Sequence, residues 1–413
     1  MANENMSISA AGLAAHHHFL TLNEYEQRAA KTDRFGSDKD SIDQLRYGLF
    51  GEVGSLLSAM KKSKRERFSQ SETESANEEL GDALWYLTAL IRREKLTLEQ
   101  VTEAAIVKLQ KHLHITDSRR ISNNSTFHEV DGLLAFQNKQ LPQPKDVLLY
   151  QLAAQAGVMF SAFGEKSTDL ACGTPLDLLA ELLSDVAMVA ATFSLKLSEI
   201  AQANLEKIES RWRPEGALYT ALFDEDSSAY EQIPRELKIA FIERDRLGKK
   251  IVFQQWRGVN IGDPLTDNRL KGDGYRYHDV FHLAYMAHLG WSPVIRGLLK
   301  CKRKSQPDTD ENEDGARAMI IEEGIATWIF NHARDGGRNY FEGVEINKLE
   351  YGLLKQVQNM VSGYEVAACP LWQWERAILD GFSVFRQLRD ATCGVICVDM
   401  NKHTITFEAL EQK

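Results

Sequence analysis

The first half of the chain carries apolar residues at the spacing of amphipathic helices. They recur three and four positions apart in IDQLRYGLFGEVGSLLSAM (42–60) and in LGDALWYLTALIRREKLTLEQVTEAAIVKLQKHL (80–113), and residues at this spacing share one face of a helix. The stretch between them, 61–79, is charged and rich in serine, which favours an exposed loop or frayed helix ends. We therefore expect packed helices here, followed by a polar linker over 116–127.

The helical pattern returns after that linker. The segment YGLFGEVGSLLSA (47–59) aligns with YQLAAQAGVMFSA (150–162), and LTLEQVTEAAIVKLQ (96–110) aligns with LKLSEIAQANLEKIE (195–209). Such self-similarity is typical of a structural repeat. It predicts a tandem helical bundle, with one domain over 1–122 and a second over 123–215.

The second copy of this repeat has lost most of its acidic residues. Gln155 stands where Glu52 stands in the first copy, and of the later acids only Glu181 and Asp185 remain. We therefore expect the second copy to keep the packing pattern and to be degenerate as a site.

The pattern changes from about residue 216 onward. The segment ELKIAFIERDRLGKKIVFQQWRG (236–258) alternates apolar and polar residues around a Leu-Gly-Lys turn, and GVICVDMNKHTITFEAL (394–410) contains two short alternating runs around Asn401. Both patterns predict β-hairpins, with mainly helical sequence between them. The expected fold is therefore mainly α, with a carboxyl-terminal α+β domain over 216–413.

Composition narrows the class of protein. A chain of 413 residues exceeds one ordinary core, and no apolar run approaches the roughly 20 residues of a membrane span. The net charge of −10 disfavours a broad nucleic-acid surface. Five scattered cysteines, and an amino terminus without a basic region followed by a long apolar stretch, favour a cytoplasmic protein. Cys393 and Cys397 lack the partner pair that a zinc site needs.

Carboxylates interrupt the two apolar helices of the first copy. Glu79 and Asp82 lie three residues apart and share a helical face, with Glu78 at its edge, and Glu52 lies on the neighbouring helix. Acids on two packed helices would repel one another unless a divalent cation neutralises them, and an all-oxygen site suits Mg²⁺ or Mn²⁺. The alternative is that the acids are solvated, or that they favour a helix amino terminus through the helix dipole.

These acids resemble the metal site of a known family. The motifs EVGS (52–55) and EELGD (78–82) are similar to the E-x-x-E and E-E-x-x-D helices of the MazG-like, all-α nucleoside triphosphate pyrophosphohydrolases. The resemblance covers about 20–120 and implies that Glu52, Glu79 and Asp82 are metal ligands, assisted by Glu78. Ser55 replaces the second glutamate of the first motif.

The same resemblance implies a reaction and an assembly. A metal-activated water attacks the α-phosphorus of a nucleoside triphosphate and yields a monophosphate and pyrophosphate. Lys61 and Lys62 are candidates to contact phosphate oxygens, the alternative being a solvated helix end. Enzymes of this family pair their helical units, so the second copy is expected to form a pseudo-dimer with the first, and the chain is expected to be a homo-oligomer.

A second cluster of chemically capable side chains lies in the last domain. His278, Asp279 and His282 fall within about one helical turn, and Glu322 and Glu323 occur on a later predicted helix. A mixed imidazole and carboxylate set favours Mn, Fe, Zn or Ni over Mg. The alternative is a structural network between helices.

This last region also shows family resemblances. The segment resembles the carboxyl-terminal domain that accompanies MazG units in some bacterial proteins. Its His-Asp pair is similar to that of HD-type phosphohydrolases, although the other histidine and the distant aspartate of that pattern are not identifiable.

The sequence as a whole predicts a metal-dependent nucleotide pyrophosphohydrolase acting on a small-molecule nucleotide, with no nucleic-acid or membrane partner. Motifs of P-loop, Rossmann and serine-hydrolase enzymes are absent from the sequence. Two alternatives remain open. One is a nucleotide-sensing or scaffold protein with a weakened first site, which Ser55 favours, and the other is a hydrolase that uses the carboxyl-terminal His/carboxylate cluster.

Overall fold

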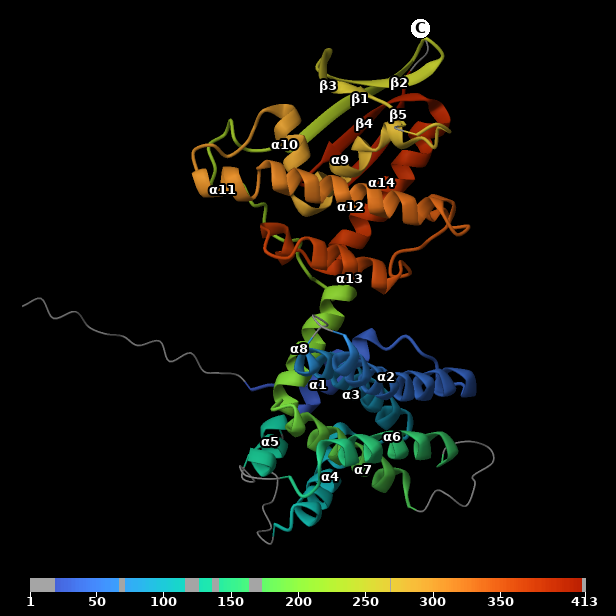
Figure 1. Ribbon diagram of the computed structural model, residues 1–413, viewed down its shortest axis with the longest axis vertical. Coiled ribbons are helices and arrows are strands. Elements are labelled where there is room, and N and C mark those ends of the chain that lie inside the picture. Colours follow the sequence, from blue (N-terminus) through green and yellow to red (C-terminus); the bar gives the residue numbers. More distant parts are fainter. Residues whose placement is uncertain are drawn as a thin grey trace, which may run out of the picture. The chain divides into compact units, whose positions relative to one another are not determined.

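Figure 1 shows a computed structural model of the chain. It describes residues 19–66, 71–115, 126–135, 141–162, 173–267 and 269–410. Backbone contacts divide the chain into two compact units, which we call unit 1 (Met1–Ile208) and unit 2 (Glu209–Lys413). Most of the predicted linker, the predicted boundary at 122/123 and the amino-terminal 18 residues lie outside the described residues.

Unit 1 is helical throughout its named elements. The helices are α1 (Leu22–Thr32), α2 (Lys39–Arg65), α3 (Glu72–Arg93), α4 (Leu98–His112), α5 (Phe127–Ala135), α6 (Lys145–Ala162), α7 (Pro175–Thr192) and α8 (Leu197–Arg211). Side chains satisfy the first free N–H groups of several of them, since Thr21, Ser71, Thr97 and Thr174 each complete a capping box. The two periodic segments of the first copy are therefore helical as predicted, the second being split between α3 and α4.

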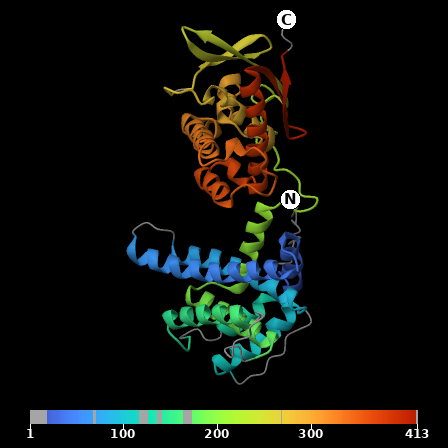
Figure 2. The same cartoon turned by 90° about the vertical axis from the view of Figure 1, so that its right-hand side faces the viewer.

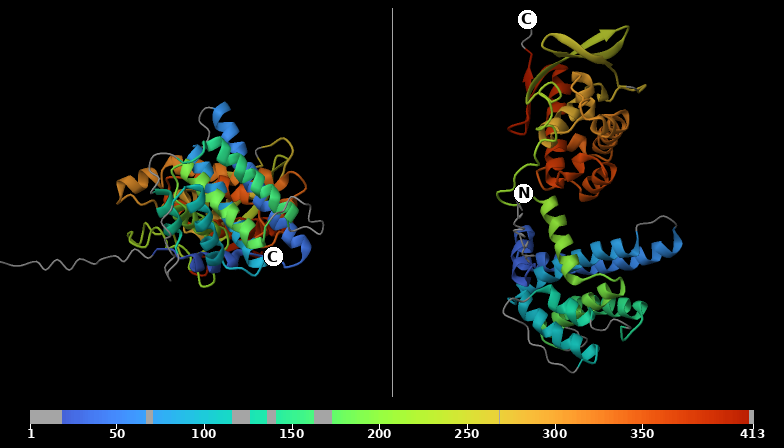
Figure 3. Two further views of the ribbon diagram at one scale, coloured as in Figure 1. Left: turned by 90° about the horizontal axis from the view of Figure 1, so that it is seen from below. Right: turned by 90° about the vertical axis from the view of Figure 1, so that its left-hand side faces the viewer.

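The central contact of unit 1 is the pairing of α2 with α3. A glycine makes their close approach possible, because a Cβ atom at Gly48 would overlap the ring of Tyr86. Helix α6 packs against α7, α2 also contacts α6, and α3 and α4 contact α7. Figure 3 shows the helices of the two predicted copies side by side within this unit.

Two helices of unit 1 begin with the same contact from a preceding short helix. The backbone N–H of Leu98 donates to Glu26 of α1 (2.8 Å), and that of Leu197 donates to Asp131 of α5 (2.7 Å). The first N–H groups of a helix have no hydrogen-bond partner within that helix, and each of these acids accepts from one of them. The corresponding positions of the two predicted copies make corresponding contacts.

Unit 2 combines helices with one antiparallel sheet. Its elements are β1 (Glu236–Arg246), β2 (Lys249–Trp256), β3 (Val259–Leu265), η1 (Tyr275–Tyr277), α9 (Asp279–Leu289), α10 (Pro293–Leu299), α11 (Pro307–Asn312), α12 (Ala316–Arg334), η2 (Asn339–Phe341), α13 (Tyr351–Met360), η3 (Glu365–Ala368), α14 (Leu371–Ala391), β4 (Cys393–Asp399) and β5 (Thr404–Ala409). The strand order is β3-β2-β1-β4-β5. Both predicted hairpins form, and β3 adds an edge strand that the sequence pattern did not predict.

An aromatic core joins the helices of unit 2 to its sheet. Helices α9 and α14 pack against each other and against β4 and β5, as Figure 2 shows. The ring of Phe281 of α9 packs in tilted contacts against Phe382 and Phe385 of α14, at ring-centroid distances of 4.5 and 5.4 Å. Such buried aromatic contacts hold α9 rigidly, which matters because α9 carries three of the predicted site residues at or near its amino end.

Among the described residues, no single helix is long and apolar enough to cross a membrane. Helices α7 and α8 reach the required length and composition together, but they are bent by 98° at the break between them.

The contact between Asp131 and the start of α8 generates a stability prediction. Asp131 is 7% exposed and also accepts from the N–H of Ser198 (3.2 Å). Asp131→Ala should lower the free energy of unfolding of unit 1 by about 1–2 kcal/mol, the usual effect of losing a helix cap. Urea denaturation would measure the change. Asp131→Asn keeps one acceptor oxygen and serves as the matched control, and equal losses in both variants would contradict the capping role.

Candidate functional site

The predicted acids of unit 1 lie on the facing sides of α2 and α3. Glu52 of α2 shares a hydrogen bond with Glu79 of α3. Burial, followed by the charge of Asp82 and the contact with Glu79, raises the pKa of Glu52 to about 8. Burial also raises the pKa of Glu79. The two carboxylates would therefore repel each other if both were ionised.

A lysine and an asparagine of α8 contact the other acids of this group. The ammonium of Lys207 lies 2.5 Å from Asp82 Oδ2 and 3.1 Å from Glu78 Oε1. Asn204 donates to Asp82 Oδ1 (3.2 Å) and accepts from the hydroxyl of Tyr25 (2.9 Å). Helix α8, which belongs to the predicted second copy, thus contributes a positive charge to these acids.

A pocket opens beside Glu79. Its volume is ≈ 420 Å³. Ser55 and Lys62 from α2 line it together with Glu79 from α3. The predicted phosphate-contacting Lys62 and the predicted metal ligand Glu79 therefore lie in the same pocket, and Ser55, the departure from the family motif, lies there too. Lys61 is exposed on α2.

The acids that remain in the second copy show a related arrangement. Glu181 of α7 pairs with Lys108 (3.0 Å) and His112 (2.8 Å) of α4. Burial works to raise the pKa of Glu181, but these two partners hold it below the usual value. Asp185 lies one turn further along α7, and burial together with the charge of Glu181 raises its pKa to about 7.

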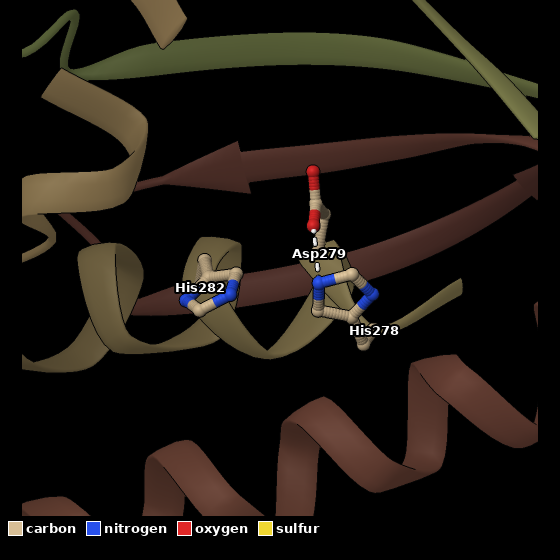
Figure 4. Close-up of side chains that lie close together, drawn as sticks. All are labelled: His278, Asp279 and His282. Carbon is tan, nitrogen blue, oxygen red and sulfur yellow. Dashed lines mark ion pairs between the residues drawn. The ribbon is translucent and has the colours of Figure 1, made fainter. Parts of the chain in front are cut away.

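The metal-donor side chains predicted in unit 2 meet at the amino end of α9. The ligand atoms of His278, Asp279 and His282 all lie within 4.8 Å of one another, and all three residues are buried. Figure 4 shows the two imidazoles and the carboxylate close together, with the ion pair between His278 and Asp279 dashed. Among the described residues, Glu52, Glu79 and Asp82 do not form a comparably tight group.

Hydrogen bonds determine which nitrogen each imidazole presents. Nδ1 of His278 donates to the carbonyl of Tyr275 (2.9 Å), and Nδ1 of His282 lies 2.9 Å from the carboxylate of Glu322. Both partners are acceptors, so both Nδ1 atoms carry a hydrogen. The Nε2 atoms point to the common centre, and that of His282 is buried without a hydrogen-bond partner.

The two glutamates of α12 have different positions. Glu322 is fully buried and accepts from Ser292 Oγ (2.6 Å) and the N–H of Val294 (2.8 Å), in addition to its contact with His282. It orients an imidazole and does not face the centre. Glu323 does face it, with Oε2 at 3.6 Å from His278 Nε2 and 3.5 Å from His282 Nε2.

Charge and burial compete at these groups. Burial opposes the charged form of His282, but the carboxylates of Glu322 and Glu323 outweigh it and raise the pKa of His282 well above its usual value. Burial likewise opposes the ionised form of Glu323, yet the two imidazoles lower its pKa. The centre therefore favours ionised carboxylates that face positive charge.

The sequence pattern missed several residues of both sites. Lys207 and Asn204 reach the acids of unit 1 only because α8 of the second copy folds back onto α3. Gln254 of β2, which donates to Asp279 Oδ2, comes from a strand far from α9 in the sequence. A repeat-based alignment offers the only sequence signal, since Lys108 and Lys207 occupy matching positions of the two aligned segments.

Comparison with known proteins identifies the last part of the chain. A family model described as the MazG C-terminal domain matches residues 218–411. The chain is related to the MazG family. This MazG-related chain is also 35% identical over 79 residues to the Gene 37 protein of Mycobacterium phage L5, which is 18% of the chain and 69% of that protein. No solved structure shows a significant match. The pyrophosphohydrolase resemblance of the amino-terminal part stays a prediction.

Asp185 of the MazG-related chain generates a prediction about pH. Its pKa is about 7 in the folded state, so the folded chain holds this proton more tightly than the unfolded chain. The resulting stabilisation is present below the unfolded pKa and declines as the pH rises from about 4 to about 7, by up to about 1.4 kcal/mol per pH unit.

Asp185→Asn should remove this decline. Urea denaturation across the same pH range would show the variant gaining stability over the wild type as the pH rises. Asp146→Asn, at an exposed position of α6, is the matched control. A pH-independent difference between Asp185→Asn and the wild type would contradict the prediction.

Proposed function

We propose that unit 1 is a metal-dependent nucleotide pyrophosphohydrolase, which cleaves a nucleoside triphosphate to a monophosphate and pyrophosphate. The observation that carries the proposal is the pocket in which Ser55 and Lys62 of α2 meet Glu79 of α3. It combines a carboxylate that can hold a metal ion with a lysine that can contact a phosphate. Of the metal ligands that the MazG resemblance implies, Glu79 lines this pocket.

The carboxylates of unit 1 fit a magnesium or manganese ion. The raised pKa values of Glu52 and Glu79 mean that their ionised forms lack compensating charge, which a divalent cation would provide. All donors are oxygens, the ligands that Mg²⁺ prefers. When bound, the ion would lower the pKa of a water molecule and neutralise phosphate charge.

The residues of the chain have separable roles in this reaction. Glu52, Glu79 and Asp82 would hold the ion, and Lys62 would donate to phosphate oxygens and orient the substrate. Water forms a bond to the α-phosphorus, and the bond from that phosphorus to the bridging oxygen breaks. The oxygen leaves with pyrophosphate.

We also propose a tandem duplication, which agrees with the contacts of two lysines. Lys207 contacts Glu78 in the predicted first copy, and Lys108 contacts Glu181 in the predicted second copy; Glu78 and Glu181 occupy corresponding positions of the two aligned segments. Gln155, at the position of Glu52, donates to the carbonyl of Leu178 (3.4 Å). We infer that the second copy is degenerate as a catalyst and acts as the pairing partner of the first.

A second candidate function is nucleotide sensing without turnover. The specific observation that favours it is the ammonium of Lys207 beside Asp82 and Glu78, because a cation of the protein itself then compensates part of the acid cluster. Ser55 in place of a fourth carboxylate weakens metal binding in the same direction. Such a protein would bind a nucleotide and leave it intact.

The decisive experiment incubates the full chain with a panel of ribo- and deoxyribonucleoside triphosphates and with Mg²⁺ or Mn²⁺, and resolves pyrophosphate from phosphate. Glu79→Gln keeps the side-chain shape and removes one charge. It should reduce pyrophosphate release by at least about 100-fold, the upper end of the effect of losing a group that merely supports a metal ligand.

Two matched variants make this experiment specific. Glu103→Gln, at an exposed position of α4, should keep full activity. Glu323→Gln in unit 2 should also keep it, because that residue belongs to the other cluster. Full pyrophosphate release from Glu79→Gln would contradict the proposal, and binding of nucleotides without release by the wild type would favour the sensing function.

Ser55→Glu provides an independent prediction. The side chain at this position lines the same pocket as Glu79, so a glutamate there would restore the fourth carboxylate of the family motif. We expect pyrophosphate release to rise and the Mg²⁺ concentration for half-maximal activity to fall, both measured in the same assay. Ser55→Gln controls for side-chain size, and equal effects of the two variants would show that charge is not the cause.

A further inference from the structure

We propose that unit 2 binds a divalent transition-metal ion through His278, Asp279, His282 and Glu323, and that the adjoining pocket binds the phosphate group of a small ligand. The proposal concerns a second site. It does not depend on the function proposed for unit 1.

The orientation of the two imidazoles is the first argument. With both Nδ1 atoms protonated, the Nε2 atoms of His278 and His282 offer either a lone pair or an additional proton to the centre. A buried Nε2 of His282 that has no hydrogen-bond partner is costly in a purely structural network. A metal ion would bind both lone pairs and both facing carboxylates.

Supporting contacts of the kind found around metal ligands provide the second argument. Glu322 holds His282 through Nδ1, and it is itself held by Ser292 and the N–H of Val294. Gln254 holds one oxygen of Asp279 and leaves the other, Oδ1, 3.1 Å from His278 Nε2. Carboxylate–histidine pairs of this type fix the tautomer and raise ligand basicity. The mixed nitrogen and oxygen donors suit Mn, Fe, Zn or Ni.

The pocket beside this centre is the third observation. It has a volume of ≈ 740 Å³ and is lined by His278, Asp279 and Glu323 on one side and by Lys300 and Lys302 on another. Within the part of the chain that the structure describes, no carboxylate forms an ion pair with either lysine. Two lysines that line a pocket without acidic partners indicate an anionic ligand.

Buried ion pairs hold the lysine segment in place. Arg303 is 1% exposed, and its guanidinium contacts Asp314 (2.7 Å) and Glu365 (2.6 Å). Its backbone N–H also donates to Asp314 (2.7 Å). Because this arginine is anchored inside the unit, the neighbouring Lys302 is positioned on the pocket wall.

Charge makes the anion site depend on the metal. Without a metal ion, the lysines share the pocket with three carboxylates, those of Asp279, Glu323 and Asp263, and these weaken the attraction of a phosphate. A divalent ion cancels the charge of two carboxylates and leaves the pocket with a net positive charge. We therefore expect phosphate to bind only after the metal ion.

Metal binding is tested by equilibrium dialysis of the full chain against Mn²⁺, Co²⁺ or Zn²⁺ alone. Glu323 has an exposed fraction of 43%, so Glu323→Gln should fold. The affinity of this variant for the metal ion should be at least about 10- to 100-fold weaker than that of the wild type. The variant should therefore retain one equivalent of tightly bound metal less than the wild type. The exposed Glu311→Gln in α11 is the matched control. Any metal bound in unit 1 contributes equally to all three proteins.

Ligand binding is tested by calorimetric titration of the Mn²⁺-loaded chain with inorganic phosphate and, separately, with adenosine monophosphate. Lys302→Gln should weaken binding of the phosphate group about 10-fold, the effect of losing one charged hydrogen bond, whereas Lys304→Gln should not. Tighter binding of the monophosphate than of free phosphate would identify an ester as the ligand.

Two results would overturn the proposal. Equal metal content in the wild type and Glu323→Gln would remove the metal site. Phosphate binding that is unchanged by metal removal or by Lys302→Gln would remove the ligand site, and a metal-loaded chain that binds neither phosphate nor the monophosphate would do the same.

Discussion

Carboxylates that are held together on packed helices need a nearby positive charge, and this requirement determines the chemistry of both units. In unit 1 the facing sides of α2 and α3 bring Glu52 against Glu79, and the pKa of Glu52 rises to about 8. Lys207 compensates Asp82 and Glu78 but leaves that pair uncompensated. In unit 2 the imidazoles of His278 and His282 lie beside the carboxylates of Asp279 and Glu323. At both places the proposed metal ion would add positive charge beside the carboxylates.

The two sites differ in how firmly their donors are oriented. In unit 2, Glu322 is fully buried and holds His282, while the aromatic core of α9 and α14 keeps the helix itself in place. In unit 1 the acids lie at a helix pair whose positive partner comes from α8. The donor atoms in unit 2 are nitrogens and oxygens, whereas those in unit 1 are all oxygens. These two sets suit different metal ions, so the chain would carry two metal sites of distinct chemistry.

Local patterns predicted the elements well where one face of an element is apolar. The helices of the first copy and both hairpins follow from periodicity, and Leu247 and Gly248 have the positive φ angles that the predicted turn between β1 and β2 requires. The edge strand β3 escaped prediction because Gly262 and Pro264 interrupt its alternation. An edge strand tolerates them, since one of its sides forms no ladder.

The sequence by itself determined which residue types could do chemistry and which helix faces they occupy. The motif positions of Glu79 and Asp82, and the close spacing of His278 and His282, follow from 3.6 residues per turn. Only the tertiary structure decided which groups meet. Lys207 reaches Asp82 across 125 residues of chain, and Glu322 reaches His282 across 40. Helical periodicity carries no information about such distant partners, because they depend on how the helices pack.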